Sequence, residues 1–195
     1  MKPEIVVVVH NVRSLHNVGS IFRTADGAGV AKIYLVGITP APLDAFGRVR
    51  PQIAKVSLGA ERIVAWDGSA RRPRAVRRLL ENLKHEGYKI FAVEQSRKSI
   101  PYYKIPKSYV LSPSAKGGSA SGGKYCLVLG NEVRGLPPSI LEFADETLEI
   151  PMRSALVRDA CHPRRVGRGK ESLNVSVAFG IVVYALTFGY NKRKI

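Results

Sequence analysis

The sequence predicts an α/β fold in which a mostly parallel β-sheet is flanked by helices. Short β-branched or apolar runs, the pattern of buried parallel strands, recur along the chain. Segments with helical spacing separate several of these runs, which is the order expected of strand–helix–strand units. The 195 residues are 45% hydrophobic and 24% charged, a composition that can bury a core.

The N-terminal region predicts a first strand–helix–strand unit. Ile5–Val9 is a β-branched run and predicts a buried strand. A polar loop follows, and then Val18–Gly29 has helical spacing, with Asn17 placed to serve as the N-cap. Lys32–Val36 predicts the next strand, so a parallel pairing with the first strand is expected.

The middle of the chain is basic. Thr39–Lys55 is rich in proline and in basic residues and is predicted to be a loop. A short strand at Ile63–Trp66, a basic helix over Pro73–His85 and a buried strand at Tyr88–Glu94 are expected to follow.

The C-terminal part opens with a low-complexity segment of serine and glycine, Ser112–Gly123, which predicts a flexible loop. Strands are predicted at Tyr125–Leu129 and Thr147–Ile150, and a helix between them at Pro137–Phe143, with proline in its first turn. A long apolar helix is predicted over Ser172–Phe188. Neither an internal repeat nor a second hydrophobic core is visible, so a single domain is expected over residues 1–195.

The charge balance narrows the class of partner. The chain carries 31 Lys and Arg against 15 Asp and Glu, a formal net charge of +16. This excess predicts a polyanionic partner, with nucleic acid first and an anionic membrane surface second. The apolar run near the N-terminus is too short for a signal peptide or a membrane span. Two cysteines and four histidines show no spacing typical of a metal site. A cytoplasmic protein without membrane or metal partners is therefore expected.

Three polar stretches follow predicted strands, at the edge where open parallel sheets bind ligands. They are residues 11–25 (NVRSLHNVGSIFRTA), residues 129–135 (LGNEVRG), and residues 150–152 with 172–174 (IPM and SLN). Each has a structural alternative: a helix cap, a surface charge, a glycine turn or an acceptor for helix amides. Asn17 and Ser172 could be helix caps, and Arg23 could be a surface charge. Gly130 and Gly135 could be turn residues, and Glu132 could accept hydrogen bonds from amides at a helix start.

Taken together, the three stretches resemble the signature motifs of the SpoU/TrmH branch of the SPOUT methyltransferases. The matching positions are Asn17-x-Gly19-x-x-x-Arg23-x-Ala25, Leu129-Gly130-Asn131-Glu132-x-x-Gly135, and Ile150-Pro151-Met152 with Ser172-Leu173-Asn174-Val175-Ser176. The resemblance implies S-adenosylmethionine (AdoMet) as methyl donor and a ribose 2′-hydroxyl of tRNA or rRNA as acceptor. It also implies a C-terminal trefoil knot, an exception to the rule that chains do not thread loops, and a homodimer whose site is completed across the interface.

The resemblance also implies roles for single residues. Arg23 would act on the ribose hydroxyl, either as a base or, since arginine stays protonated, by holding a phosphate and stabilising developing alkoxide charge. Orientation of Arg23, the ribose and the cofactor would fall to Asn17, Glu132, Ser172 and Asn174. The cofactor cradle would be formed by Leu129, Gly130, Asn131, Ile150, Met152, Ser172 and Leu173.

The chain departs from the family pattern at Ser154–Arg168, an insertion between the two halves of the third motif. It is expected to be a basic flap that contacts substrate phosphates, with a tolerated surface insertion as the alternative. The predicted RNA-contacting residues are Arg13, Arg158, Arg164, Arg165 and Arg168. If the insertion blocked the cofactor pocket, the chain would instead be a catalytically silent RNA-binding protein that keeps the knotted fold.

Overall fold

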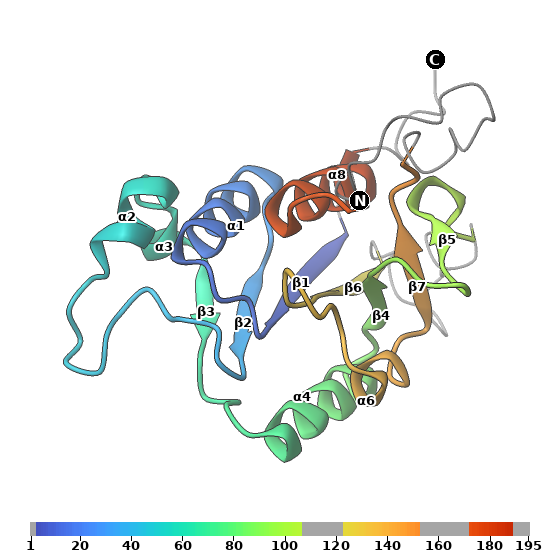
Figure 1. Ribbon diagram of the computed structural model, residues 1–195, viewed down its shortest axis with the longest axis horizontal. Coiled ribbons are helices and arrows are strands. Elements are labelled where there is room, and N and C mark those ends of the chain that lie inside the picture. The colour runs from blue at the N-terminus through green and yellow to red at the C-terminus, as the bar shows by residue number, and fades with distance from the viewer. Residues whose placement is uncertain (1–2, 107–122, 153–171, 189–195) are drawn as a thin grey trace, which may run out of the picture.

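The computed structural model describes residues 3–106, 123–152 and 172–188. Within them lies a seven-stranded sheet of order β3-β2-β1-β6-β4-β7-β5, in which every neighbouring pair is parallel (Figure 1). The predicted α/β class with a parallel sheet flanked by helices is confirmed. The trefoil knot depends on the path of residues 153–171, which lie outside the described ranges, and stays a prediction.

The elements alternate along most of the chain. The first part contains β1 (Glu4–His10), α1 (Leu15–Ala28), β2 (Lys32–Val36), α2 (Pro51–Ser57), α3 (Ala60–Ile63), β3 (Ala65–Asp67) and α4 (Pro73–His85). The second part contains β4 (Lys89–Val93), β5 (Ile100–Pro101), the 3₁₀ turn η1 (Tyr102–Lys104), β6 (Lys124–Leu129), α6 (Pro138–Leu141), β7 (Glu146–Glu149) and α8 (Val175–Phe188).

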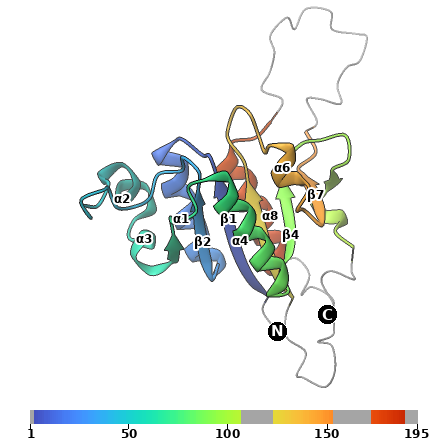
Figure 2. The same cartoon turned by 90° about the horizontal axis from the view of Figure 1, so that it is seen from below.

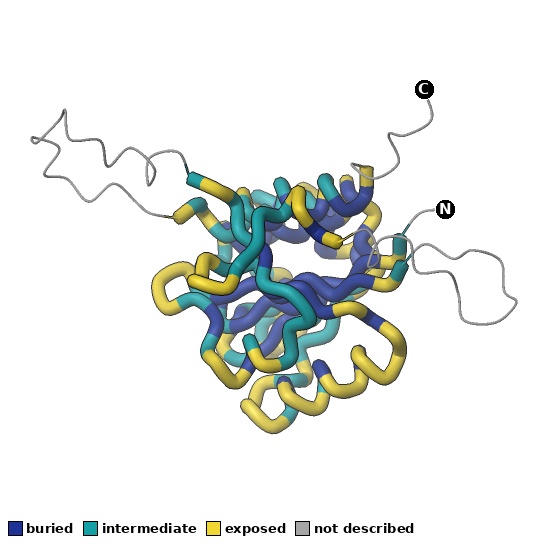
Figure 3. The backbone as a smooth tube through the Cα atoms, turned by 90° about the vertical axis from the view of Figure 1, so that its right-hand side faces the viewer, coloured by how far each residue is buried: buried dark blue, intermediate teal, exposed yellow. Residues whose placement is uncertain are grey.

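Helices cover both faces of the sheet. In Figures 1 and 2, α1, α2, α3 and α8 lie on one face, and α4 and α6 lie on the other. Alternate residues of β1 point to opposite faces, so Val7 and Val9 pack under α1 and α8 whereas Val6 and Val8 pack against α4. The strands are therefore buried on both sides, as the dark central band of Figure 3 shows.

The start of α1 differs from the prediction. Ser14, not Asn17, is the N-cap: its side-chain oxygen accepts a hydrogen bond from the Asn17 main-chain N–H at 3.2 Å. The helix thus begins at Leu15, about one turn earlier than predicted, because His16 and Asn17 interrupt the apolar spacing of its first turn. The Asn17 side chain is consequently released from capping and is free for other contacts.

The basic stretch between β2 and β3 is also more ordered than predicted. Thr39–Lys55 was expected to be a loop, but α2 begins at Pro51, a residue that suits the first helical position. The predicted strand Ile63–Trp66 is displaced, because α3 extends to Ile63 and β3 covers Ala65–Asp67.

Near the C-terminus, α8 begins at Val175 rather than at Ser172, so the third motif precedes the helix. None of the helices in the described ranges is long and apolar enough to cross a membrane. The Ser112–Gly123 segment, apart from its last residue, and the Ser154–Arg168 insertion lie outside the described residues.

Replacing Gly19 with alanine is expected to destabilise the fold. A Cβ at this position of α1 would lie 2.8 Å from the Ile53 carbonyl oxygen and 2.9 Å from the Val56 Cβ, so α1 and α2 would have to separate. Overpacking of this kind costs about 1–3 kcal/mol of unfolding free energy, measurable by urea denaturation. Gly180→Ala on α8 is the control, since its Cβ would meet Thr24 at an ordinary 3.7 Å. Equal stability of the two variants would contradict the prediction.

Candidate functional site

A cavity of about 710 Å³ opens at the carboxyl ends of β4, β6 and β7 and reaches the segment before α8. Most of the predicted cofactor cradle lines it: Leu129, Gly130, Asn131, Ile150, Ser172 and Leu173. Met152, the remaining predicted cradle residue, is not among the lining residues. The parallel order of the sheet therefore gathers segments that are far apart in sequence.

Glu132 connects the second motif to the first. Its Oε1 atom accepts hydrogen bonds from the Asn17 side-chain Nδ2 at 3.0 Å and from the Ser14 main-chain N–H at 3.3 Å. Its Oε2 atom accepts from the Arg13 main-chain N–H at 3.3 Å. Glu132 thus also has the structural role considered for it, because its carboxylate accepts hydrogen bonds from main-chain amides at the start of α1.

The electrostatics of Glu132 follow from these contacts. Burial by itself would raise the pKa of the Glu132 carboxyl, but hydrogen bonds from its own main chain, from Asn17 and from the Arg13 and Ser14 amides outweigh it. The pKa is lowered as a result, so the group is ionised at neutral pH. A carboxylate held in this way is suited to fixing its neighbours rather than to accepting a proton.

Asn174 connects the third motif to the same network. Its Nδ2 atom donates to Oδ1 of Asn17 at 3.0 Å, so Asn17 lies between Glu132 and Asn174. The Oδ1 atom of Asn174 accepts from the Ser176 main-chain N–H at 2.9 Å, which makes Asn174 the residue that caps α8. The alternative that Ser172 caps this helix is therefore wrong, because Ser172 lies outside its first turn.

The loop after β6 is held in a tight turn by Asn131. The side chain of Asn131 donates to the Asn11 carbonyl at 2.8 Å and accepts from the Val133 and Arg134 amides. Its main chain is bridged to Gly135, which adopts a φ of +65°. Gly135 is thus a turn residue that needs positive φ, which is the structural role that the sequence analysis considered for it.

Gly130 has a different requirement. It is not among the glycines of positive φ, but a Cβ there would lie 2.7 Å from the Gly135 carbonyl carbon. The residue must therefore be small because the two ends of the loop approach each other.

Glu94 is a site residue that the sequence analysis did not single out. It follows β4, lines the cavity, and accepts hydrogen bonds from the Leu136 N–H at 2.8 Å and from the Gln95 N–H at 3.1 Å. Its carboxylate occupies the space that a Cβ on Gly135 would enter. The available signal was its position directly after a buried strand, at the same sheet edge as the other polar residues.

The structure does not bring every predicted site residue together. Arg23 is exposed on α1 and does not line the cavity. It follows Asn17 by six positions, so on an α-helix it lies about 9 Å further along and about 120° around the axis. The Arg13 side chain lines a second cavity, described below, and Arg158, Arg164, Arg165 and Arg168 lie outside the described residues.

Asn17→Asp is expected to disrupt this network selectively. The new carboxylate would keep the acceptor used by Asn174 but place a second negative charge at the contact with Glu132. Repulsion should raise the pKa of one carboxyl, so the loss of stability relative to the wild type should be largest near neutral pH and shrink toward about pH 4.

Thermal unfolding of this variant at several pH values measures the effect. Asn82→Asp, at an exposed position of α4, is the matched control and should show little change. A pH-independent loss of stability in Asn17→Asp would contradict the contact with an ionised Glu132.

Comparisons with known proteins agree with this geometry. The tRNA (guanosine(18)-2′-O)-methyltransferase of Aquifex aeolicus is 28% identical over 182 residues, a match that covers 93% of this chain and 67% of the relative. The crystal structure of the A. aeolicus TrmH/SpoU tRNA modifying enzyme has a TM-score of 0.66 at 28% identity, covering 94% of this chain and 74% of that chain.

The AdoMet-bound rRNA methyltransferase from Sinorhizobium meliloti has a TM-score of 0.68 at 24% identity, covering 95% of this chain and 56% of that chain. This chain thus spans only part of the length of its relatives. The SpoU rRNA Methylase family itself matches residues 4–157, which include the first two motifs and the first half of the third. The chain belongs to the SpoU rRNA Methylase family.

Proposed function

We propose that this chain is an AdoMet-dependent methyltransferase that acts on a ribose 2′-hydroxyl of tRNA or rRNA, as a single domain in the cytoplasm. The observation that carries the proposal is the hydrogen-bonded series Glu132–Asn17–Asn174, which links all three motifs beside the cavity. Membership of the SpoU rRNA Methylase family and the activities for which its relatives are named support it.

The cavity fits the chemistry of AdoMet. Its volume of about 710 Å³ lies within the range of small-molecule sites. Leu129, Leu148 and Ile150 provide an apolar wall suited to an adenine, and the carboxylates of Glu94 and Glu149 suit a cationic group. No lysine or arginine occurs among the described residues that line it. When bound there, AdoMet supplies the methyl group from its sulfonium.

The residues of the chain orient the acceptor. Glu132 accepts hydrogen bonds that fix the start of α1 and orient the Asn17 side-chain amide. Asn17 accepts a hydrogen bond from Asn174 and so positions this residue at the start of α8. This rigid group would hold the ribose so that its hydroxyl approaches in line, which lowers the entropic part of the barrier. Arg23 would hold the adjacent phosphate and stabilise the developing alkoxide, the role that suits a protonated guanidinium.

A homodimer would bring Arg23 to the site. Within one chain Arg23 is exposed and does not line the cavity, so an Arg23 from a partner subunit is the arrangement that would supply it. The surface of α8 supports such a partner: Val177, Tyr184 and Phe188 are 50%, 45% and 48% exposed, and with Ile181 they form one apolar stripe. A core helix of a monomer would not leave this stripe in water.

Calorimetric titration of AdoMet into the purified protein tests the proposal first. Saturable binding, followed by transfer of labelled methyl groups to tRNA or rRNA from cells that lack this protein, is the expected result. RNA binding without AdoMet binding would instead favour the catalytically silent RNA-binding protein. Mapping of ribose methylation in the two cell types would then identify the nucleotide.

Arg23→Ala is expected to abolish methyl transfer while AdoMet affinity changes by no more than a few-fold. Arg23 does not line the cavity, and removal of a transition-state donor typically costs about 10²–10³ in rate. Arg62→Ala, which removes an exposed guanidinium from α3, should retain full activity. Retention of more than about a tenth of the wild-type rate by Arg23→Ala would refute the role.

The double variant Val177→Glu and Tyr184→Glu is expected to sediment as a monomer where the wild type sediments as a dimer. Two charges in the α8 stripe would have to be buried in the proposed interface. Ile63→Glu is the control, since Ile63 is 72% exposed on α3, away from the stripe. A monomeric wild type at micromolar concentration would contradict both the dimer and the shared site.

A further inference from the structure

A second cavity, of about 810 Å³, opens beside the start of α1. Its walls come from the segment between β2 and α2, from β3 and the turn after it, and from Arg13 and Leu15 at the start of α1. None of the three signature motifs accounts for it. We refer to it as the arginine cavity, because Arg13, Arg50 and Arg71 line it.

The arginine cavity adjoins the proposed cofactor cavity. Arg13 lines the arginine cavity, whereas Glu132 lines the cofactor cavity, and the Arg13 main-chain N–H donates to Glu132 Oε2 at 3.3 Å. The two cavities are therefore linked through a hydrogen bond between residues that line them. A polymer that placed one unit at the cofactor cavity could place its neighbour in the arginine cavity.

One arginine of the cavity has a buried side-chain donor without an acceptor among the described residues. Arg71 donates to the Gly37 and Thr39 carbonyl oxygens and so holds the wall together. The Nε atom of Arg50 is buried and has no hydrogen-bond acceptor among the described residues. A buried donor of this kind is costly unless a ligand supplies the acceptor, and an anionic oxygen is the strongest one.

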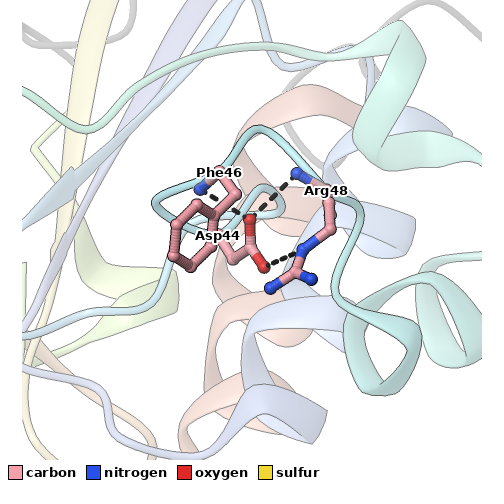
Figure 4. A network of polar contacts seen from close by, with 3 residues as sticks. All are labelled: Asp44, Phe46 and Arg48. Atoms are coloured by element: carbon pink, nitrogen blue, oxygen red, sulfur yellow. Dashed lines mark hydrogen bonds and ion pairs between the residues drawn. The ribbon is translucent and has the colours of Figure 1, made fainter.

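Among the described residues that line the cavity, Asp44 is the one acidic residue, and its carboxylate already accepts hydrogen bonds from its own loop. Figure 4 shows its carboxylate accepting from the Phe46 N–H at 2.8 Å, the Arg48 N–H at 2.9 Å and the Arg48 Nε at 2.9 Å. The hydrogen bond from the Arg48 main chain is the main reason that the pKa of Asp44 is lowered. Asp44 thus shapes the loop and remains an anion.

The same loop presents apolar surface next to the cations. Phe46 is 81% exposed at its tip, with the Arg48 guanidinium 4.8 Å from the ring centre. Inside the cavity, Trp66 and the 59%-exposed Ile38 form part of the lining. Aromatic and apolar groups beside arginines are the combination on which single-stranded RNA stacks its bases and places its phosphates.

We propose that the arginine cavity binds the nucleotide next to the one that is methylated, with its phosphate on Arg13 and Arg50 and its base against Trp66. The inference rests on the proposed function and assigns the chain a specificity site for the RNA. Because the base would contact a shaped wall rather than open solvent, the cavity would select which nucleotide flanks the target ribose.

Trp66 provides a direct probe, since it is the only tryptophan of the 195 residues. A mixed-sequence RNA octamer titrated into the full chain is expected to quench its fluorescence in a saturable manner. Inorganic polyphosphate of equal charge should compete weakly and leave the emission unchanged. The proposal is overturned if fluorescence anisotropy shows that the octamer binds while Trp66 emission stays unchanged. It is also overturned if polyphosphate reproduces the quenching.

Arg50→Met tests the phosphate contact, because it keeps an unbranched side chain but removes the guanidinium. Octamer affinity should fall about tenfold or more, and the slope of log affinity against log salt should flatten by about 0.7 for one lost contact to a single strand. Arg62→Met, whose exposed guanidinium pairs with Glu61, is the matched control. An unchanged affinity and salt slope in Arg50→Met would overturn the proposal.

Phe46→Ala and cross-linking keep the test decisive if Arg50→Met does not fold. Phe46 is exposed, so its removal should leave unfolding unchanged while weakening octamer binding several-fold. Photocross-links from a bromouridine octamer to the wild-type chain should map to the segments that line the arginine cavity, which are residues 13–15, 38–50 and 66–71. Cross-links confined to other residues would overturn the proposal. If AdoMet binding and methyl transfer persist in that case, the proposed function stands and this inference alone fails.

Discussion

The hydrogen bonds between the Glu132 carboxylate and the start of α1 are the contact on which the site depends. A loop that follows β6 is joined by them to main-chain amides that precede α1, and the remaining capacity of the same carboxylate orients Asn17. Charge-assisted bonds of this kind contribute more than neutral ones, and the acceptor is kept anionic by the donors that surround it. Without Glu132, the Asn17 and Asn174 side chains would lose the hydrogen bond that connects them to the loop after β6.

This contact is possible because the parallel sheet brings the ends of β1 and β6 side by side. Their register pairs Val9 with Leu129, so the loops that carry the first and second motifs emerge at one level. Glycines at 130 and 135 then let the second loop fold back tightly enough to reach α1 and to admit the Glu94 carboxylate. The absence of a Cβ at these two glycines is therefore as important for the geometry of the site as its polar side chains.

Periodicity identified most of the fold because the strands are buried on both faces and read as continuous apolar runs. It failed where polar residues masked a helix or its start: His16 and Asn17 interrupt the first turn of α1, and α2 lies in a basic, proline-containing stretch. β5 has two residues, too few for any pattern to register. Of the site, the motif residues were predictable from the family resemblance, and their meeting in space from the parallel sheet. Glu94 offered only its position after a buried strand, and the Arg50 Nε without an acceptor offered no signal, because both depend on tertiary contacts that no spacing in the sequence encodes.

The position of β6 has a consequence for how the chain is made. Its neighbours are β1 and β4, yet it leaves the ribosome long after β1: the contact between Asn131 and Asn11 spans 120 residues. At translation rates of about 5–20 residues per second, that interval is roughly 6 to 24 s. During it, β1 can pair with β2 on one side only, and its other edge, a run of valines, stays open to any passing strand. The sheet therefore cannot be completed until β6 has been synthesised, and until then the edges of both β1 and β4 that β6 will occupy stay unpaired.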